Sequence, residues 1–500
     1  MGDIVQEYSP PPALRTRTAS HRYAVYKGMT PAAKAKVIEE EADANGIERP
    51  RDYIVSFHYN AKVEEHHFGR SHPMKPWRLQ LTKQLILSYG LEYAMDMYKT
   101  RMATSDELAL FHDREYLDFL AEVTPTNLLE KEKAAGKFNF GGESNDCPAF
   151  DGMWDYARLY SGASIHAAER LVNGQSDIAI NWSGGLHHAG KSRASGFCYL
   201  NDIVLAILHL LKVHQRVLYI DIDVHHGDGV QDAFHSTDRV LTLSYHKYAG
   251  NDFFPGTGGV DENGPAEPDN PGARYSLNVP LEDGIDDQQY EWLFEMITGP
   301  VIEQYNPGAI VLQCGADSLG GDRLGKFNLN IRTHGFCVEF VKKTGRPLLL
   351  VGGGGYTPRN VARAWCHETA LCVGAELMDE LPMHVPYRQA FEGEANGDGK
   401  LYPSLHNNGV NRHVNRNNNA ELKKLVAKVL TNLRYWKGSP SIEMGQLPKR
   451  FMQLRKDIDD ELREEEEDRE RPAAENNRRK IEKNVGGRGE HREQTRMYQG

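Results

Sequence analysis

The segment 221–229 concentrates acidic and imidazole side chains directly after an apolar run. It reads Asp-Ile-Asp-Val-His-His-Gly-Asp-Gly and follows residues 217–220, which have the composition of a buried strand. In an open α/β sheet, ligands bind just outside the carboxyl ends of the strands. Because side chains alternate along a β-strand, we expect Asp221, Asp223 and His225 to point to one face. An Asp-x-His pair on that face can hold one metal ion and leave coordination positions open, as catalytic centres do.

A third metal ligand is expected at Asp317. This residue ends the segment Cys-Gly-Ala-Asp, which follows the apolar run 309–313. A lone Asp in such a place is more often a helix N-cap, but a position at the same sheet edge as Asp223 and His225 favours a site of two carboxylates and one imidazole. The alternative for residues 221–228 is a solvated turn, which five titratable groups within eight residues make unfavourable.

Two adjacent histidines, His187 and His188, follow the predicted strand 177–180 in a glycine-containing loop. The glycines allow the loop to turn, so that neighbouring rings can be aimed at different partners. With Asp221 and Asp228 still unassigned, two His–Asp pairs are expected. A carboxylate orients its imidazole and raises its basicity, as general acid–base catalysis requires.

Glycines also adjoin aromatic residues that could serve a pocket. Residues 352–355 are all glycine and precede Tyr356, in a spacing that is neither a P-loop nor Gly-x-Gly-x-x-Gly. A phosphate-binding loop and a close backbone approach at a pocket both remain open; in the second case Tyr356 can donate to an oxyanion. Gly196-Phe197 and Phe253-Phe254 are each most simply core packing, but as a pair they could clasp a narrow alkyl chain.

Apolar strand-like runs alternate with helical periodicity from residue 53 onward. The expected strands are 53–57, 177–180, 217–221, 240–245, 276–279, 309–313 and 348–351. Helices are expected near 77–89, 105–111, 114–121, 149–172, 201–213, 286–305, 332–343, 358–372 and 420–433. This alternation predicts the α/β class: a single open, mostly parallel β-sheet flanked by helices on both faces.

Both ends of the chain differ from this pattern. Residues 1–50 are expected to be an N-terminal extension, partly disordered, with one helix over 31–44 that begins after the N-cap Thr30. Residues 51–448 are the predicted folded domain. The tail 449–500 is mostly charged and polar, includes the acidic run 464–468, and is predicted to be disordered.

Composition limits the classes of partner. The net charge of −11 disfavours direct nucleic-acid binding and suits a basic partner or substrate. No apolar stretch approaches the ~20 residues of a membrane span, so no membrane association is expected. The six cysteines form no Cys-x-x-Cys pair, which favours reduced thiols in an intracellular protein.

Taken together, these motifs resemble the class I zinc-dependent histone deacetylases of the arginase–deacetylase superfamily. The resemblance extends from about residue 51 to about residue 450. It includes His72-Pro-Met-Lys-Pro, Asp146-Cys-Pro, Gly185-Leu-His-His, Ala194-Ser-Gly-Phe-Cys-Tyr, 221–229, Phe254-Pro-Gly-Thr-Gly, Gln313-Cys-Gly-Ala-Asp and 352–356. Within class I the chain is most similar to the subgroup that works in corepressor complexes, of fungal type. The resemblance implies an arginase/deacetylase fold over 51–448 and hydrolysis of N6-acetyl-lysine on histone tails.

The resemblance implies a role for each matching residue. Asp223, His225 and Asp317 would bind one Zn²⁺, and Tyr356 would bond the substrate carbonyl. His187 would pair with Asp221, and His188 with Asp228. The implied substrate-binding residues are Asp146, Gly196, Phe197, Phe254 and Leu324.

Further ligands and partners are implied in the same way. Family members bind a structural K⁺ through groups around 221–225 and the hydroxyl of Ser244. Those that join corepressors bind an inositol phosphate at a basic seam, which would include His67, Lys75, Arg323 and Arg359. The alternative for these four residues is scattered surface charge. Acetylated histone tails and corepressor subunits are the implied partners, and the nucleus is the implied location, with the cytoplasm as a second one.

Alternatives and departures from the family pattern remain. An acetylpolyamine or arginase-like metallohydrolase is one alternative, and a weakly active scaffold subunit is another. Iron could replace zinc, because an Asp₂His site is not strongly selective for zinc. Trp77 and Arg193 depart from the family pattern, and Arg193 would alter the charge at the rim of the site.

Overall fold

The computed structural model describes residues 30–140, 146–393, 397–406, 412–436, 460 and 463. The chain divides into two units, 1–437 and 438–500. The first unit holds the fold described below. The predicted tail 449–500 lies almost entirely outside the described residues, as do residues 1–29 of the predicted extension.

Eight strands form one sheet in the order β2-β1-β3-β8-β7-β4-β5-β6, and each neighbouring pair is parallel. The strands are β1 (Val55–Tyr59), β2 (Asp96–Lys99), β3 (Ile178–Asn181), β4 (Val217–Asp221), β5 (Val240–Lys247), β6 (Ser276–Leu281), β7 (Ala309–Gln313) and β8 (Leu348–Val351). The predicted open, mostly parallel sheet is therefore confirmed.

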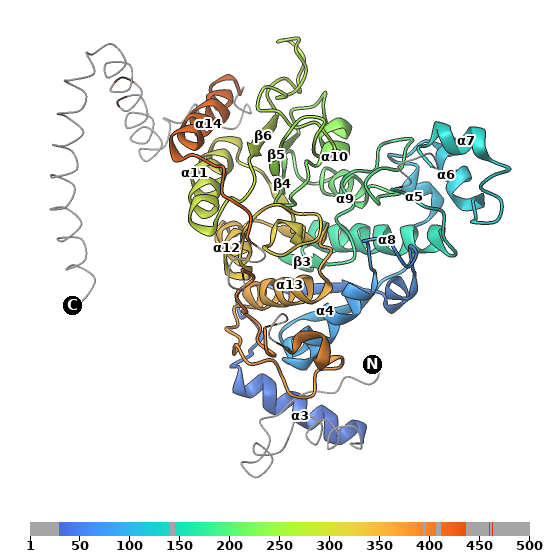
Figure 1. Cartoon of the computed structure of the whole chain (residues 1–500), viewed down its shortest axis with the longest axis vertical. Helices are drawn as coiled ribbons and strands as arrows, with labels where there is room; N and C mark the ends of the chain where they lie inside the picture. The colour runs from blue at the N-terminus through green and yellow to red at the C-terminus, as the bar shows by residue number, and fades with distance from the viewer. Residues whose placement is uncertain are drawn as a thin grey trace. The chain divides into compact units, whose positions relative to one another are not determined.

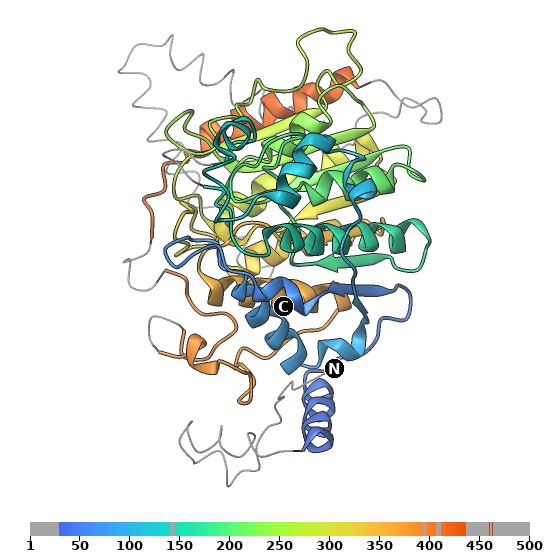
Figure 2. The same ribbon diagram turned by 90° about the vertical axis from the view of Figure 1, so that its right-hand side faces the viewer.

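Helices cover both faces of the sheet (Figures 1 and 2). One layer consists of α8 (Met153–Val172), α9 (Asp202–Leu210) and α10 (Asp228–Ala233). The other consists of α4 (Trp77–Ser88), α13 (Pro358–Val373), α12 (Ile331–Lys342) and α11 (Asp287–Tyr305), with α14 (Asn419–Thr431) packed on α11. The shorter helical elements are α5 (Ser105–Leu108), α6 (Arg114–Glu122), α7 (Glu132–Lys137), η1 (Ala61–Glu65), η2 (Leu91–Ala94), η3 (Ala316–Ser318), η4 (Arg388–Phe391) and η7 (Asn432–Tyr435).

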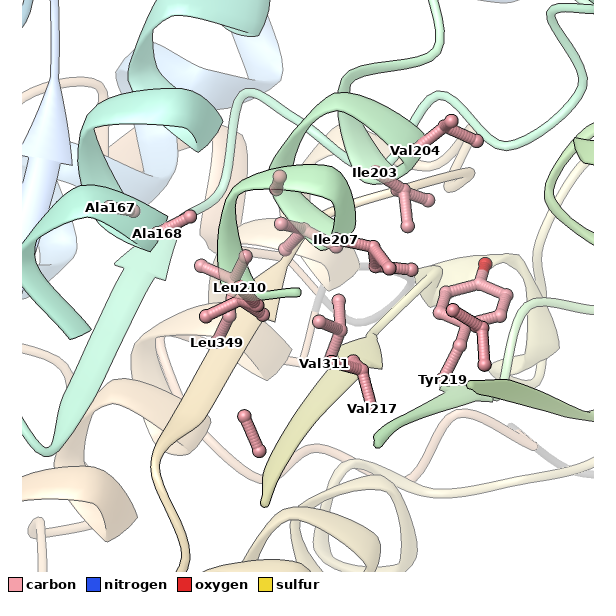
Figure 3. Packing of buried hydrophobic residues seen from close by; sticks show 14 of the residues in the cluster. Ala167, Ala168, Ile203, Val204, Ile207, Leu210, Val217, Tyr219, Val311 and Leu349 are labelled. Carbon is pink, nitrogen blue, oxygen red and sulfur yellow. The ribbon is translucent and has the colours of Figure 1, made fainter. Parts of the chain in front are cut away.

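The core between the sheet and the α8–α9 layer explains the continuous apolar runs in the sequence. Figure 3 shows Ile207 and Leu210 of α9 facing Val217, Val311 and Leu349 on three neighbouring strands. All five side chains are buried. A strand buried on both faces has no polar side to present, so its sequence loses the alternation of a half-exposed strand. Full burial of one such side chain contributes about 1.5–3 kcal/mol.

Residues 30–47 pack against the rest of the unit. Helix α3 (Pro31–Ala44) has the predicted bounds, and the Thr30 hydroxyl accepts a hydrogen bond from the backbone N–H of Ala33 at 3.3 Å. The side chain of Asn45 accepts a hydrogen bond from the backbone N–H of Met378 at 3.1 Å. Buried apolar residues of this segment are Val37, Ala42 and Ile47.

Some elements differ from the sequence prediction at the edge of the sheet. Strand β1 begins two residues later than predicted, and β2 was not predicted at all. The residues of β2 alternate between half-buried and exposed, and both of its ends are charged. A short, polar edge strand carries little of the apolar signal on which the prediction depends. In the described part of the chain, no helix combines the length and apolar character needed to cross a membrane.

Candidate active site

The predicted site residues follow four strands that are adjacent in the sheet. The order β3-β8-β7-β4 brings the loops after these strands to one edge, because all four are parallel. The loops carry His187 and His188 after β3, Tyr356 after β8, Asp317 after β7, and residues 223–228 after β4. Residues more than a hundred positions apart thereby meet at the carboxyl edge, as open α/β sheets favour.

Asp223, His225 and Asp317 form a buried cluster of metal-ligand type. One ligand atom from each lies within 4.8 Å of the others. The Nδ1 atom of His225 is 3.1 Å from Asp223 Oδ1 and 3.0 Å from Asp317 Oδ2. Across the described residues this is the one group of three or more such side chains close enough to hold an ion. Two carboxylates and one imidazole nitrogen fit a divalent cation and leave room for water or a substrate oxygen.

Hydrogen bonds from the surrounding loops fix both carboxylates. Asp223 Oδ2 accepts from the side chain of Gln313 at 2.9 Å and from the backbone N–H of Gly354 at 2.8 Å. Asp317 Oδ1 accepts from the backbone N–H of Val224 at 2.9 Å. Burial and the negative charge of Asp223 raise the pKa of Asp317. A bound cation would relieve this repulsion, which supports the assignment of a metal site.

The predicted common face of Asp221, Asp223 and His225 is wrong. Strand β4 ends at Asp221, so the alternation of side chains along a strand does not extend to the other two residues. Asp221 Oδ2 lies 2.7 Å from Nδ1 of His187 and accepts from the hydroxyl of Tyr219 at 2.6 Å. Asp221 therefore orients a histidine, whereas Asp223 and His225 turn toward Asp317.

Both predicted His–Asp pairs are present and lie side by side. His187 Nδ1 is 2.7 Å from Asp221 Oδ2, and His188 Nδ1 is 2.7 Å from Asp228 Oδ1. The two imidazole centroids are 3.9 Å apart. His187 Nε2 is 3.8 Å from Asp223 Oδ2, so this ring faces the metal-ligand cluster.

The two histidines have opposite pKa shifts. Burial lowers the pKa of both rings, but for His187 the charges of Asp221 and Asp223 outweigh burial and raise the pKa to about 9. For His188, burial and the positive charge of His187 lower the pKa to about 4. Without a metal ion, His187 is therefore protonated and His188 neutral at neutral pH. A bound cation would lower the pKa of each ring.

Tyr356 is held beside the cluster by the glycine loop. Its backbone N–H donates to Asp322 Oδ2 at 2.7 Å. Burial and the charges of Asp317 and Asp223 raise the pKa of its phenol well above the usual value, so the hydroxyl remains a donor. A Cβ atom on Gly354 would lie 2.0 Å from Asp317 Oδ2. The glycines thus permit close backbone approach, the second of the two interpretations left open by the sequence.

Aromatic rings stand on both sides of these groups. The Phe254 ring lies 4.9 Å from that of His188, nearly perpendicular to it, and is 41 % exposed. The Phe197 ring lies 5.7 Å from that of Tyr356, also nearly perpendicular. The backbone N–H of Gly196 donates to Asp146 Oδ2 at 2.9 Å. Phe254 and Phe197, two of the predicted tunnel residues, thus lie beside His188 and Tyr356.

The loop that carries Leu324 is held by Asp322, a carboxylate that was not predicted from the sequence. Asp322 accepts from the backbone N–H groups of Leu324 at 2.9 Å, Gly325 at 3.1 Å and Tyr356 at 2.7 Å. It joins the loop after β7 to the loop after β8. An isolated Asp after two glycines gives no sequence signal for this function, because its partners are backbone groups.

The four predicted seam residues line one cavity of about 810 Å³. Its lining includes His67, Lys75, Arg323 and Arg359, together with Glu64, Glu65, Trp77 and Tyr356. Burial and the charge of Arg323 lower the pKa of Lys75. These four residues therefore share one cavity, which favours the predicted seam over scattered surface charge; its inositol phosphate ligand stays a prediction. The unexpected Trp77 packs edge-on against Tyr387, with ring centroids 6.1 Å apart.

Arg193, the second departure from the family pattern, has a solvent-facing side chain. Its guanidinium lies 3.9 Å from Asp232 Oδ2, and the side chain is 53 % exposed. Such an exposed pair contributes little to stability. Its positive charge therefore faces solvent.

Comparison with known proteins identifies the family. The family model of the histone deacetylase domain matches residues 72–372. The chain belongs to the histone deacetylase family. Human histone deacetylase 1 is 48% identical over 394 residues, which cover 79% of this chain and 78% of the human protein. Histone deacetylase B of Dictyostelium discoideum is 50% identical over 411 residues, 82% of this chain and 94% of the amoebal protein.

This family membership makes the chain a hydrolase that acts on acetyl-lysine. A third relative, the probable histone deacetylase 1-B of Xenopus laevis, is 46% identical over 414 residues, 83% of this chain and 81% of the frog protein. The predicted class I resemblance is therefore confirmed. The relatives named here are animal and amoebal, and the fungal origin stays a prediction.

Proposed function

We propose that this histone deacetylase removes acetyl groups from N6-acetyl-lysine of histone tails with one Zn²⁺ held by Asp223, His225 and Asp317. The observation that carries the proposal is the buried three-ligand cluster beside two His–Asp pairs of opposite pKa shift. When bound, the metal ion supplies Lewis-acid polarisation of a carbonyl and lowers the pKa of water. Iron in place of zinc would use the same ligands.

The side chains around the cluster have separate roles in the proposed reaction. His188 is neutral and its Nδ1 is engaged by Asp228, so Nε2 accepts the proton of the attacking water and later protonates the departing lysine nitrogen. The carboxylates of Asp221 and Asp223 favour the protonated form of His187, which would stabilise negative charge electrostatically. The Tyr356 hydroxyl donates to the oxyanion that forms on the substrate carbonyl.

Phe197 and Phe254 support the choice of a linear acyl-lysine as substrate. The two rings flank Tyr356 and His188 from different loops. Gly196 lets the His188 and Phe254 rings come close to its backbone, since a Cβ atom there would lie 2.4 Å from His188 Cδ2 and 2.9 Å from Phe254 Cε1. Asp146, bonded to the Gly196 N–H, is placed to hold the substrate backbone at the entrance.

A comparison of substrates tests the proposal. The purified chain should deacetylate acetylated histone peptides, and Asp223→Ala should abolish this activity together with zinc binding. Faster hydrolysis of acetylated polyamines than of peptides would favour the alternative hydrolase. Zinc binding without hydrolysis of any acetylated amine, with or without a corepressor module, would support a scaffold.

The cavity beside Tyr356 supports regulation by an inositol phosphate in a corepressor complex. His67, Lys75, Arg323 and Arg359 converge there, and clustered Lys and Arg side chains suit phosphate groups. The proposed complex acts in transcriptional repression in the nucleus. An inositol phosphate should raise kcat/KM of the wild-type chain bound to a corepressor module, and Arg323→Ala should remove that increase.

A structural K⁺ below the metal cluster is the last proposed ligand. Strands β4 and β5 pair Asp221 with Ser244, and both residues are buried. Oxygen atoms of a carboxylate and a hydroxyl are suitable ligands for a hard cation. Exchange of K⁺ for a bulky organic cation should lower the unfolding temperature if this site is used.

A further inference from the structure

Phe253 lies flat against the metal-ligand histidine His225. The two ring planes are 4° apart, with centroids separated by 5.2 Å. Phe253 is half-buried in the loop after β5, next to the tunnel residue Phe254. An offset parallel stack of this kind is favourable and restricts rotation of both rings. The neighbouring Phe254 meets His225 at 69°, edge to face, and gives no second parallel surface.

The ring of His225 needs this support because its second nitrogen, Nε2, makes no hydrogen bond among the described residues that would fix the ring plane. Metal-binding histidines usually donate their second N–H to a carboxylate or carbonyl, which fixes the plane of the ring. His225 Nδ1 faces Asp223 and Asp317. Within the described parts of the chain, its Nε2 has no hydrogen-bond partner. Besides the two carboxylates at Nδ1, ring contacts are therefore left to fix the plane of this imidazole.

Lys247 connects this stack to the backbone of the metal-ligand loop. Its ammonium lies 5.0 Å from the centroid of Phe253, a cation–π distance. The same ammonium is 2.6 Å from Asp283 Oδ1, which holds it in place. The backbone N–H of Lys247 donates to the carbonyl of Val224 at 2.9 Å. The last residue of β5 thus binds the residue before His225 and supports the ring that stacks on it.

We propose that Phe253, backed by Lys247, is a positioning residue that fixes the plane of His225 for metal binding. This inference rests on the proposed function, because it requires His225 to be a metal ligand. It assigns a role to residues that the proposed mechanism does not use. A purely structural role for Phe253 would be met by any apolar side chain of similar volume, whereas an orienting role requires a flat ring.

Zinc affinity and a spectroscopic signal separate these two roles. Phe253→Leu should weaken zinc binding roughly 10- to 100-fold, the range found when outer contacts of metal ligands are lost. Competition with a chromophoric chelator measures this affinity. The visible absorption of the Co²⁺-substituted protein reports ligand geometry, and its bands should shift in Phe253→Leu. Phe253→Tyr keeps the ring and should match the wild type, and Lys247→Met should weaken zinc binding several-fold.

A matched control uses another aromatic ring covered by a cation. Arg274 lies 3.9 Å from the centroid of Tyr435, which belongs to η7 and not to the site. Tyr435→Leu should leave zinc affinity and the Co²⁺ spectrum unchanged. The metal-free unfolding temperature of each variant shows whether it folds.

The results distinguish this inference from the proposed function. Wild-type affinity and an unchanged Co²⁺ spectrum in Phe253→Leu would overturn the inference, while zinc loss in Asp223→Ala would still uphold the proposed function. Equal zinc binding by the wild type and Asp223→Ala would overturn the proposed function instead. If Phe253→Leu does not fold, an unchanged affinity and spectrum in Lys247→Met would overturn the inference.

Discussion

Two neighbouring histidines acquire different chemistry from their surroundings alone. His187 and His188 have the same partner type at the same distance of 2.7 Å. Only His187 also faces the carboxylate of Asp223, and its positive charge in turn acts on His188. In the proposed mechanism, one residue type therefore supplies both a positive charge and a proton acceptor. Environment separates the two pKa values, as it does for catalytic pairs in general.

The pH dependence follows from the lowered pKa of His188. As a general base His188 must be neutral, and its pKa of about 4 keeps it so well below the ordinary value of 6.5. The acid limb of kcat/KM should therefore lie below pH 6.5. Asp228 raises this pKa, so Asp228→Asn should move the acid limb to lower pH while kcat falls. A limb that moves to higher pH in the variant would contradict the assigned base.

Tyr356 gives the most isolated test of oxyanion stabilisation. Tyr356→Phe keeps the ring that packs against Phe197 and removes only the donor. Loss of one such donor typically lowers kcat about 10²- to 10³-fold. Zinc content should equal that of the wild type, because the phenol is not a metal ligand. Steady-state kinetics on an acetyl-lysine peptide measures the loss, and near wild-type turnover would disprove the role.

At the scale of elements, the strand order decides which loops meet. The sequence indicated β4, β7 and β8 with the observed bounds, because their apolar runs are continuous. The sequence also indicated which side chains leave those strands. It did not indicate where the side chain of Asp221 points relative to Asp223 and His225. That depends on where strand β4 ends, which is decided by hydrogen bonds to strands distant in the chain. The role of Asp322 and the stacking of Phe253 on His225 were not predicted for the same reason: the partners of both residues belong to other loops.

A substitution at Gly354 tests the role of the glycine loop after β8. Gly354→Ala would place a Cβ atom 2.0 Å from Asp317 Oδ2, so the ligand or the loop must shift. Zinc binding and activity should both fall, with a loss of folding stability of about 1–3 kcal/mol as in other overpacked sites. Thermal unfolding and zinc titration measure the two effects.

Gly136→Ala is the matched control for this change. Gly136 lies in α7, and a Cβ atom there would meet nothing within 4 Å. Alanine in a helix is more stable than glycine by roughly 0.5–1 kcal/mol. Activity should therefore remain and stability should not fall. If both variants behave alike, the glycine loop is not shaped by the metal ligands.

For the whole molecule, periodicity was sufficient to predict seven of the eight strands and most of the flanking helices, and the spacing of acidic and imidazole residues indicated the site motifs. The cavity lined by His67, Lys75, Arg323 and Arg359 could not be predicted from composition and periodicity. His67 and Arg359 are almost three hundred residues apart and line one cavity, beside which α4 packs against α13. Residue types indicated the chemistry of the metal site, but its surroundings required the fold.

One divalent cation held by Asp223, His225 and Asp317 is central to the proposed mechanism. Titration of the metal-free protein with Zn²⁺, with deacetylation of a histone peptide followed at each step, tests this directly. Activity should rise from zero and stop rising at one equivalent of zinc per chain, and Asp317→Asn should show neither tight binding nor activity. Full activity after complete chelation, or saturation only at two equivalents, would contradict the proposed site.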